Sequence, residues 1–350
     1  MVGRVEKRTK QDMTVDNIFS GKLNRQEGIW MGPSGGYWSN LNKEENNAFL
    51  KDLPTLGAKK TVETYFPQHY ETIFSPKRAG GLPLLDPKAG EVVVDTGCMW
   101  GALTIPLAKA GCKVVAIDQT HESLLLLKQR LKDEDLDNVE LVCADIKEIN
   151  YLEGSVDKFV VNGVLEWVPE TGTIELKKYY GKRSEKKNAS PASPYDIQLE
   201  FLENIHRGLK KGGTLYLAIE NRFDLFYFLG LPDLHCNLRL ITFLPRFLQT
   251  IVSKICLGRP YVNWIYSERM LRKILTDAGF TDISVFYTFP NYRFPEYILT
   301  GKGMGFYHPS LYKRRKSFAV KALCYAVENL IFNKFRLKFF SPSFIVIARK

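Results

Sequence analysis

A β-branched apolar run that ends in an acid and two glycines constrains the fold of this chain more than any other feature. Residues 91–101 read EVVVDTGCMWG, and the helix-forming stretch ALTIPLAKA follows directly. This pattern predicts a buried strand, a sharp turn and a helix. Gly97 and Gly101 stand where the chain must turn, and a residue without a Cβ lets the backbone approach a bound ligand closely. The stretch therefore predicts a ligand-binding turn at the carboxyl end of a strand.

Three further apolar runs predict strands of the same sheet, and each is followed by a polar side chain. Open α/β sheets bind ligands beyond the carboxyl ends of their strands, so we expect these side chains to share one edge. A carboxylate at the tip of the second strand can accept hydrogen bonds from both hydroxyls of a ribose. The runs are 113–117, 139–143 and 157–161, and the polar residues after them are Asp118, Asp145 and Asn162.

The glycine turn and the spaced strand-end residues together resemble those of class I S-adenosylmethionine-dependent methyltransferases. This resemblance implies that S-adenosylmethionine is the cofactor and that DTGCMWG lies under its methionine moiety. It implies that Asp118 holds the ribose hydroxyls, that Asp145 contacts the adenine amino group and that Asn162 faces the substrate and the sulfonium. The cofactor-binding residues that it implies are Asp95, Thr96, Gly97, Trp100, Gly101, Asp118, Gln119, Asp145, Ile146 and Asn162.

The same resemblance implies an α/β fold with a Rossmann-like sheet of seven strands and helices on both faces. In that sheet the seventh strand is antiparallel and lies between the fifth and the sixth, and residues 344–348 are its expected position. The expected organisation is an N-terminal arm and cap over 1–84, a cofactor-binding core over 85–288 with insertions at about 171–194 and 225–263, a basic helical insertion over 289–342, and the last core strand over 343–350.

One position departs from the family pattern. Met99 stands where the family has the middle glycine of its loop. A residue with a side chain is strained if the turn requires a positive φ at this point. We therefore expect weaker cofactor binding than a third glycine would give.

Two motifs after the fourth and fifth predicted strands are similar to those of a narrower subgroup. NGVLEWVPE at 162–170 and IENRF at 219–223 resemble prokaryotic methyltransferases associated with genes for surface polysaccharides and glycosyl transfer. A GLPDLH segment, a P-x-Y-x-x-P segment at 290–295 and the final SPSFIVIARK extend this similarity. The subgroup implies an acceptor hydroxyl on a saccharide or on another small or lipid-linked metabolite.

Candidate catalytic groups follow the fourth and fifth strands. Methyl transfer from a sulfonium requires no metal, but an acceptor hydroxyl must lose its proton, and a general base raises the rate by about 10²–10⁴-fold. Glu166 stands beside Trp167, and His235 stands in a loop expected to overhang the fifth strand as a base poised near neutral pH. We predict these two as catalytic. The predicted substrate contacts are Trp167, Glu220, Asn221 and Arg222, with pairing between Glu220 and Arg222 as the alternative.

Positive charge is concentrated at the C-terminal end of the chain. Residues 301–350 contain eleven Lys or Arg and one acid, whereas the whole chain carries a net charge of +11. Residues 312–338 predict a basic amphipathic helix, and its aromatic residues within the polar face are typical of a helix at a membrane interface. The six cysteines form no CxxC pair, and no stretch has the length and apolarity of a signal peptide or spanning helix. We expect a cytoplasmic protein with peripheral contact with an anionic membrane.

Three other functions are weighed against methylation of a small acceptor. A nicotinamide dehydrogenase would need a GxGxxG turn, which is absent. An RNA methyltransferase would fit the basic C-terminal end, yet Asn162 is followed by Gly-Val and not by Pro-Pro, and no RNA-binding module is visible. A non-catalytic binding protein would fit a degenerate loop at Met99. The oligomeric state stays open.

Overall fold

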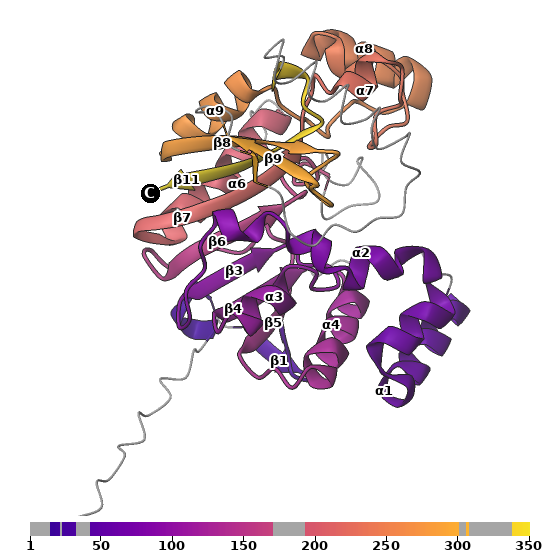
Figure 1. The fold of residues 1–350 in the computed structure, drawn as a ribbon, viewed down its shortest axis with the longest axis vertical. Helices are drawn as coiled ribbons and strands as arrows, with labels where there is room; N and C mark the ends of the chain where they lie inside the picture. The colour runs from indigo at the N-terminus through magenta and orange to yellow at the C-terminus, as the bar shows by residue number, and fades with distance from the viewer. Residues whose placement is uncertain (1–14, 22, 33–42, 171–192, 301–305, 308–337) are drawn as a thin grey trace, which may run out of the picture.

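The computed structural model describes residues 15–21, 23–32, 43–170, 193–300, 306–307 and 338–350. A mixed sheet runs through its centre, and helices pack on both faces (Figure 1). The strand order is β1-β2-β5-β4-β3-β6-β7-β11-β8-β9-β10. The predicted α/β fold is confirmed.

Seven central strands form the predicted methyltransferase-like order. Six of them run in the same direction, and the last strand in the sequence lies antiparallel between its two neighbours, as predicted. The strands are β5 (Val139–Cys143), β4 (Lys113–Asp118), β3 (Val92–Thr96), β6 (Val156–Asn162), β7 (Leu209–Glu220), β11 (Ser343–Arg349) and β8 (Thr281–Phe289).

The register brings the carboxyl ends of the parallel strands to one edge. Thr96 pairs with Ile117 on one side and Val161 on the other, and Asp118 pairs with Cys143. Residues that follow these strands are therefore neighbours in space although they are far apart in the sequence.

Helices cover both faces of this sheet because successive strand residues point to opposite sides. The leucines and isoleucines of α6 (Pro194–Gly208) and α9 (Glu268–Asp277) pack on one core, together with Val94. The short α3 (Thr104–Lys109) packs with Val93 on the other side. Leucines of α4 (His121–Asp133) fill a third cluster at the β4–β5 end.

Two hairpin-like additions extend the sheet beyond the seven predicted strands. At one edge, β1 (Asn24–Gln26) and β2 (Ile29–Met31) pair with each other, and β2 joins β5. At the other edge, β9 (Tyr297–Thr300) pairs with β8 and with β10 (Phe306–Tyr307). Strands of two to four residues leave little alternation in a sequence, which is why they were not predicted.

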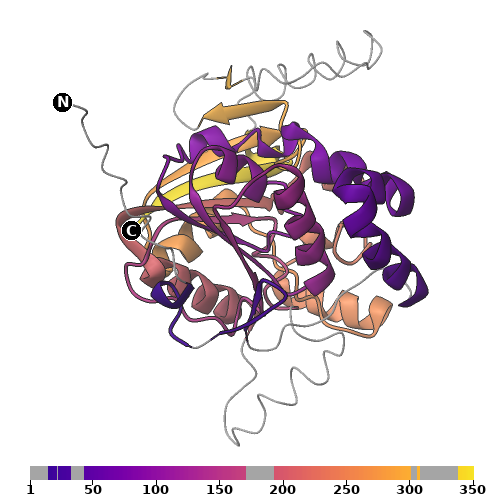
Figure 2. The same ribbon diagram turned by 90° about the horizontal axis from the view of Figure 1, so that it is seen from below.

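The N-terminal helices lie against the glycine loop. The helix α1 (Lys43–Tyr65) runs through Pro54, and its kink lies at Gly57 (φ +75°). Apolar side chains of α1 and α2 (Tyr70–Phe74) form one cluster with Trp100 of the loop. In Figure 1, α8 lies at the upper right of the molecule and α1 at its lower right, and in Figure 2 both lie on the right.

A helical segment follows β7. It contains α7 (Leu225–Phe228) and α8 (Arg246–Leu257). The KKGG segment at 210–213 lies within β7, which starts at Leu209 with a register shift opposite β6. Short 3₁₀ helices occur at Val15–Asn17, Pro67–His69, Pro76–Ala79, Leu82–Leu84, Ile241–Phe243 and Lys338–Phe340.

Several expectations fall outside the described residues. These are most of the insertion expected at about 171–194 and nearly all of the basic helix predicted over 312–338. Within the described part of the chain, no helix is both long and apolar enough to cross a membrane.

Candidate functional site

The loop between β3 and α3 requires glycine at two positions. Gly97 (φ +70°) and Gly101 (φ +74°) lie in the left-handed region. A Cβ at Gly97 would lie 2.5 Å from Cγ2 of Val164, and a Cβ at Gly101 would lie 2.2 Å from Cδ1 of Leu127. Both distances are far inside van der Waals contact. The backbone at these two glycines therefore lies close to the side chains of Val164 and Leu127, where a larger residue would not fit.

Met99 adopts a positive φ, the conformation in which a residue with a side chain is strained. Its φ is +45°, and its side chain is 40% exposed. The backbone N–H of Met99 donates to Oδ2 of Asp118 over 2.8 Å. This hydrogen bond joins the loop to the end of β4 and holds the strained residue in place.

Replacing Met99 by glycine is expected to stabilise the protein by about 0.5–1 kcal/mol. The left-handed conformation costs a residue with a side chain about 1–2 kcal/mol, and the greater freedom of glycine in the unfolded chain offsets about 0.5–1 kcal/mol of the gain. Urea unfolding measures the difference, with Met99→Ala as the control that keeps the strain. A Met99→Gly protein less stable than this control would show that the loop is not strained.

Asp118 lies at the end of β4, as predicted, and is 7% exposed. Its Oδ1 accepts a hydrogen bond from the backbone N–H of Thr120 over 2.9 Å, and its Oδ2 accepts the one from Met99. Burial raises the pKa of Asp118, while these backbone donors oppose the rise. The same carboxylate also accepts hydrogen bonds from the Thr120 side chain and the Gln119 backbone, and these donors together fix it at the end of β4.

Asp95 and Thr96 end β3 and are both buried. The hydroxyl of Thr104 donates to Oδ2 of Asp95 over 2.6 Å. Burial raises the pKa of Asp95 to about 6, although this hydrogen bond favours the charged form. Asp95 thus ties the end of β3 to the first turn of α3 beneath the loop.

The residues after β5 are less available to bind the adenine than the family pattern implies, because they already have partners within the protein. Oδ2 of Asp145 lies 3.5 Å from Nζ of Lys147, and its Oδ1 accepts from the Lys147 backbone over 3.0 Å. Ile146 is buried in the core, and Gln119 after β4 is half-buried. The ring of Trp100 lies 5.2 Å from that of His69, between their centroids, and packs against the N-terminal helices.

Asn162 supplies the clearest sign that this edge receives a ligand. It ends β6, and its buried Oδ1 has no hydrogen-bond donor among the described residues. Buried acceptors are almost always paired in folded proteins, so an orphaned one points to a missing partner. Its position next to the glycine loop fits the polar part of a nucleoside-linked amino acid such as S-adenosylmethionine.

A second group of side chains converges at the ends of β6 and β7. One ligand-type atom from each of Glu166, Glu220 and His235 lies within 4.8 Å of those of the other two, and all three residues are buried. Glu166 follows β6, Glu220 ends β7, and His235 lies in the loop before α8. The structure thus brings together both predicted catalytic residues and one predicted substrate contact.

Burial and mutual charge shift the protonation of this cluster. Burial raises the pKa of Glu166 well above its usual range, and the negative charge of Glu220 adds to the rise. Burial disfavours the charged imidazole, but a hydrogen bond with Asp233 and the charges of Glu220, Asp233 and Glu166 raise the pKa of His235 to about 9. The surroundings therefore hold the pKa of His235 above the near-neutral value expected from the sequence.

Four residues that sequence reasoning did not place in the site support the cluster. The hydroxyl of Tyr292 donates to Oε1 of Glu220 over 3.2 Å, and Nη2 of Arg293 lies 3.5 Å from the same atom. Oδ2 of Asp233 lies 3.4 Å from Nδ1 of His235 and accepts from the hydroxyl of Tyr261 over 3.2 Å. Tyr292 stands in the P-x-Y-x-x-P segment and Asp233 in GLPDLH, so the sequence signals existed but indicated no role.

Tyr292 reaches the cluster because residue 163 is glycine. A Cβ at Gly163 (φ +68°) would lie 2.1 Å from the Tyr292 hydroxyl oxygen. The glycine of the NGVLEWVPE motif therefore makes room for a residue that arrives from the other half of the sheet.

The remaining predicted substrate residues have different contacts. Nδ2 of Asn221 donates to the carbonyl oxygens of Phe339 and Ser341, each over 2.7 Å. Nε of Arg222 donates to the carbonyl of Thr242 over 2.6 Å, and its Nη2 donates to Leu244. These two side chains fix neighbouring segments, and Arg222 does not take the alternative role of pairing with Glu220.

Trp167 lies beside the cluster. Its ring centroid is 5.0 Å from that of His235, with the planes inclined by 55°. A contact of this kind restricts the imidazole and leaves Trp167 at the border of the buried cluster.

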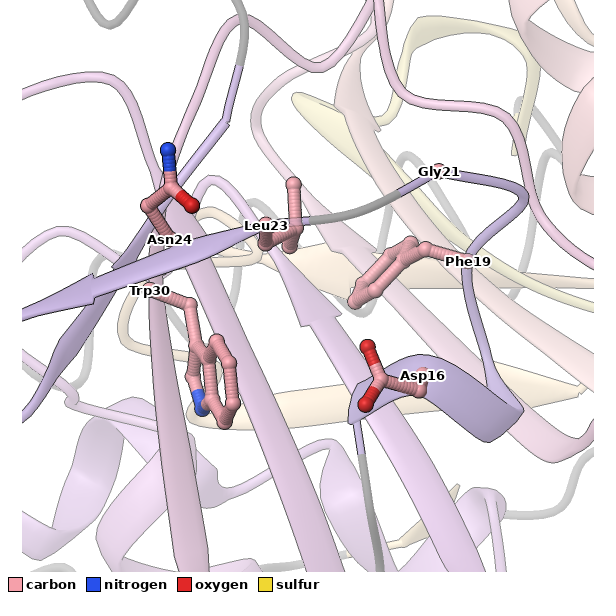
Figure 3. Close-up of a pocket in the computed structure, with 6 residues that line it drawn as sticks. All are labelled: Asp16, Phe19, Gly21, Leu23, Asn24 and Trp30. Atoms are coloured by element: carbon pink, nitrogen blue, oxygen red, sulfur yellow. The ribbon is translucent and has the colours of Figure 1, made fainter.

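A separate groove of about 470 Å³ lies at the β1–β2 edge (Figure 3). None of the predicted site residues lines it. Its lining residues are Asp16, Phe19, Gly21, Leu23, Asn24 and Trp30.

Comparison with known families agrees with this geometry. A family described as "Methyltransferase domain" matches residues 93–178. That range contains the glycine loop, Asp118, Asn162 and Glu166. The matched segment is similar to a methyltransferase domain, and this supports the prediction of S-adenosylmethionine as cofactor.

Curated relatives match only part of the chain. It is 37% identical over 81 residues to a 23S rRNA (uracil(1939)-C(5))-methyltransferase RlmD from Shewanella amazonensis, which covers 22% of this chain and 18% of the relative. It is 30% identical over 158 residues to the mitochondrial ubiquinone biosynthesis O-methyltransferase of Homo sapiens, covering 45% and 35%. In both cases the chain spans well under two thirds of the relative.

Solved structures are similar at low identity. A Haemonchus contortus phosphoethanolamine N-methyltransferase 2 aligns with a TM-score of 0.46 and 16% identity, covering 83% of this chain and 59% of that one. An S-adenosylmethionine-dependent methyltransferase from Mesorhizobium loti aligns with a TM-score of 0.45 and 14% identity, covering 79% and 100%.

Proposed function

We propose that the protein transfers a methyl group from S-adenosylmethionine to a hydroxyl of a saccharide or of another small or lipid-linked metabolite. One observation carries this proposal. A glycine loop with Asp118 and the orphaned Asn162 oxygen lies at the strand ends next to a buried cluster of Glu166, Glu220 and His235. A cofactor edge beside buried proton-binding groups is what methylation of a hydroxyl needs.

The cofactor supplies an electrophilic methyl group, and the residues of the chain bind and orient it. Asp118 accepts hydrogen bonds at the position of a ribose, while the loop at 96–101 fixes the approach of the methionine part. Asn162 offers its unpaired oxygen between this region and the cluster. Alignment of donor and acceptor and exclusion of water account for most of the acceleration of such a displacement.

The buried cluster is the part of the site that receives the acceptor. Glu166 has no exposed surface, and neither of its carboxylate oxygens has a donor among the described residues. A hydroxyl that enters here can donate to one of these oxygens. Glu220 and His235 then lie close enough to bind the same acceptor, and a carboxylate of the cluster can take up its proton.

Transfer of a labelled methyl group identifies the acceptor class. The protein is incubated with methyl-labelled S-adenosylmethionine and, separately, with saccharide, lipid-linked saccharide and total RNA fractions from the organism that carries the gene. We expect label in a saccharide or lipid-linked fraction. Label in RNA alone would contradict the proposed acceptor and favour the RNA methyltransferase reading.

We also propose that the segment around α8 contacts an anionic membrane, which would suit a lipid-linked acceptor. This helix is inverted relative to a normal surface helix, since it buries Gln249 and Ser253 and exposes apolar residues. Its Phe247, Ile251 and Ile255, spaced by four, are 65%, 48% and 78% exposed.

The surroundings of α8 extend this apolar face. Phe228, Leu229, Leu231 and Leu234 from the preceding segment are each more than half exposed. Within residues 225–257 the exposed charges are Arg239 and Lys254, whereas the single acid, Asp233, is buried. An apolar face bordered by basic side chains is typical of a helix at the surface of an anionic bilayer.

Vesicle flotation at low and high salt tests this contact. We expect the protein to float with anionic vesicles at low salt and to be released at high salt, because screening weakens the attraction of its basic residues. The double variant Ile251→Ser and Ile255→Ser should float less, while Leu152→Ser, an exposed leucine in another part of the chain, should not change. Wild-type protein that never floats would show that the α8 face is covered by another element.

A further inference from the structure

Glu166, Glu220 and His235, which the proposed function assigns to the acceptor, also form a set of ligand-type atoms that could hold a metal ion. The three atoms lie within 4.8 Å of one another and come from three segments: the turn after β6, the end of β7 and the loop before α8. Each residue is at most 8% exposed. Two carboxylates rarely lie this close in a buried place without a shared positive partner.

The hydrogen bonding of these groups is incomplete. Both carboxylate oxygens of Glu166 and Oε2 of Glu220 have no hydrogen-bond donor among the described residues. Oε1 of Glu220 has two longer contacts, with the Tyr292 hydroxyl over 3.2 Å and with Nη2 of Arg293 over 3.5 Å. Three carboxylate oxygens without a donor in one buried place require a positive charge, either a proton shared between Glu166 and Glu220 or a cation that displaces it.

We propose that Glu166, Glu220 and His235 bind one divalent cation, whose remaining coordination positions take an oxygen of the acceptor. This inference rests on the proposed function for the role of the cation, although binding of the cation itself does not. Atoms coordinated at about 2.1 Å to one ion lie about 3–3.5 Å apart, so atoms now up to 4.8 Å apart must approach each other by up to about 1.3–1.8 Å on binding. Such a shift is within the reach of small side-chain rotations.

Asp233 has the position of a residue that orients a metal-bound histidine. Its Oδ2 lies 3.4 Å from Nδ1 of His235, which leaves the other ring nitrogen for a cation. Its Oδ1 accepts from the backbone N–H groups of His235 and Cys236, each over 2.9 Å, so the carboxylate is itself fixed. Metal-bound histidines commonly donate their second N–H to a carboxylate held in this way.

The local charge also favours a divalent ion. With the carboxylates ionised and the imidazole neutral, as metal binding requires, Glu166, Glu220 and Asp233 carry three negative charges. Arg293, in contact with Glu220, carries one positive charge. The remaining charge of about −2 matches one divalent cation.

The donor set indicates which cation fits. Two carboxylates and one imidazole suit Mn²⁺, Zn²⁺ or Fe²⁺ better than Mg²⁺ or Ca²⁺, which prefer oxygen donors alone. Three protein ligands leave open positions for a substrate oxygen. The acceptor would then be a molecule that offers a hydroxyl oxygen to a metal ion.

Mn²⁺ binding to full-length protein stripped with EDTA tests the proposal. We expect one Mn²⁺ per chain by electron paramagnetic resonance, with the affinity lowered more than 100-fold in Glu166→Gln and 10–100-fold in Asp233→Asn, the range for residues behind a metal ligand. Glu203→Gln, an exposed glutamate on α6, is the control and should bind as wild type does. Mn²⁺ should also raise the melting temperature of wild type and of Glu203→Gln only.

S-adenosylhomocysteine binding, measured in the same samples, separates the two proposals. If Mn²⁺ binds no more tightly to wild type than to Glu166→Gln, the cation site is wrong, whether or not the cofactor binds. If Mn²⁺ binds as expected but S-adenosylhomocysteine does not, the site stands and the proposed function fails. Circular dichroism confirms that each variant is folded, and His235→Asn replaces Glu166→Gln if that variant does not fold.

Discussion

Replacing Glu166 by glutamine should lower the rate of methyl transfer by about 10²–10⁴-fold. The change keeps the size of the side chain but removes the carboxyl group that can hold or release a proton beside Glu220 and His235. Because the acceptor is activated in the transition state, affinity for S-adenosylhomocysteine should stay within about threefold. Single-turnover kinetics on the identified acceptor, together with calorimetry, separates the two effects.

His235→Ala should act in the same direction, since it removes the third member of the cluster and releases Asp233. Glu203→Gln is again the control. Wild-type turnover in both Glu166→Gln and His235→Ala would mean that the buried cluster plays no part in the reaction and that alignment of donor and acceptor suffices.

Replacing Asp118 by alanine should weaken S-adenosylmethionine binding by roughly 1.5–3 kcal/mol, the range for hydrogen bonds to a charged group. This corresponds to about 10–150-fold in affinity. The structure adds a second effect, because the backbone N–H groups of Met99 and Thr120 both donate to this carboxylate. Loss of these two hydrogen bonds should also lower the free energy of unfolding, by about 1–3 kcal/mol.

The two effects of Asp118→Ala are measured separately. Urea unfolding gives the stability, and calorimetry at a temperature where the variant is folded gives the affinity. Asp16→Ala, an exposed aspartate, serves as the control for both. Unchanged affinity in a folded Asp118→Ala protein would show that the acid at the end of β4 does not hold the ribose.

The central sheet could be predicted because each of its parallel strands is a short apolar run that ends in a distinctive residue. The bounds of β5 agree with the prediction, and β4 differs by the single added residue Asp118. The edge strands could not be predicted, since β1, β2 and β10 are too short to show alternation. Their positions depend on pairing with β5 and β9, which only the folded chain provides.

The site was predictable in its residue types but not in its connections. Glu166 and His235 stood out because each follows a strand, yet 68 residues separate them along the chain and nothing in their spacing indicates contact. Tyr292 and Arg293 approach from beyond β8, a position fixed by long-range packing. The raised pKa of His235 could not be foreseen, because it depends on Asp233, Glu220 and Glu166 being buried together.

Asn221 and Arg222 were predicted to contact the substrate, but the structure gives them other hydrogen-bond partners. Both directly follow β7 at the binding edge, where a polar residue is typical of a ligand contact. In the structure their donors go to carbonyl oxygens of segments near 340 and 242–244. Position at a strand end therefore indicated the right neighbourhood but could not distinguish a ligand contact from a structural hydrogen bond.

Calorimetric titration of the wild-type protein with S-adenosylmethionine tests the central claim most directly. The account predicts saturable binding of one molecule per chain, competed by S-adenosylhomocysteine and weakened in Asp118→Ala but not in Asp16→Ala. The absence of binding to protein shown to be folded would contradict the account, and it would instead favour a non-catalytic protein whose loop, with Met99 at its centre, no longer holds the cofactor.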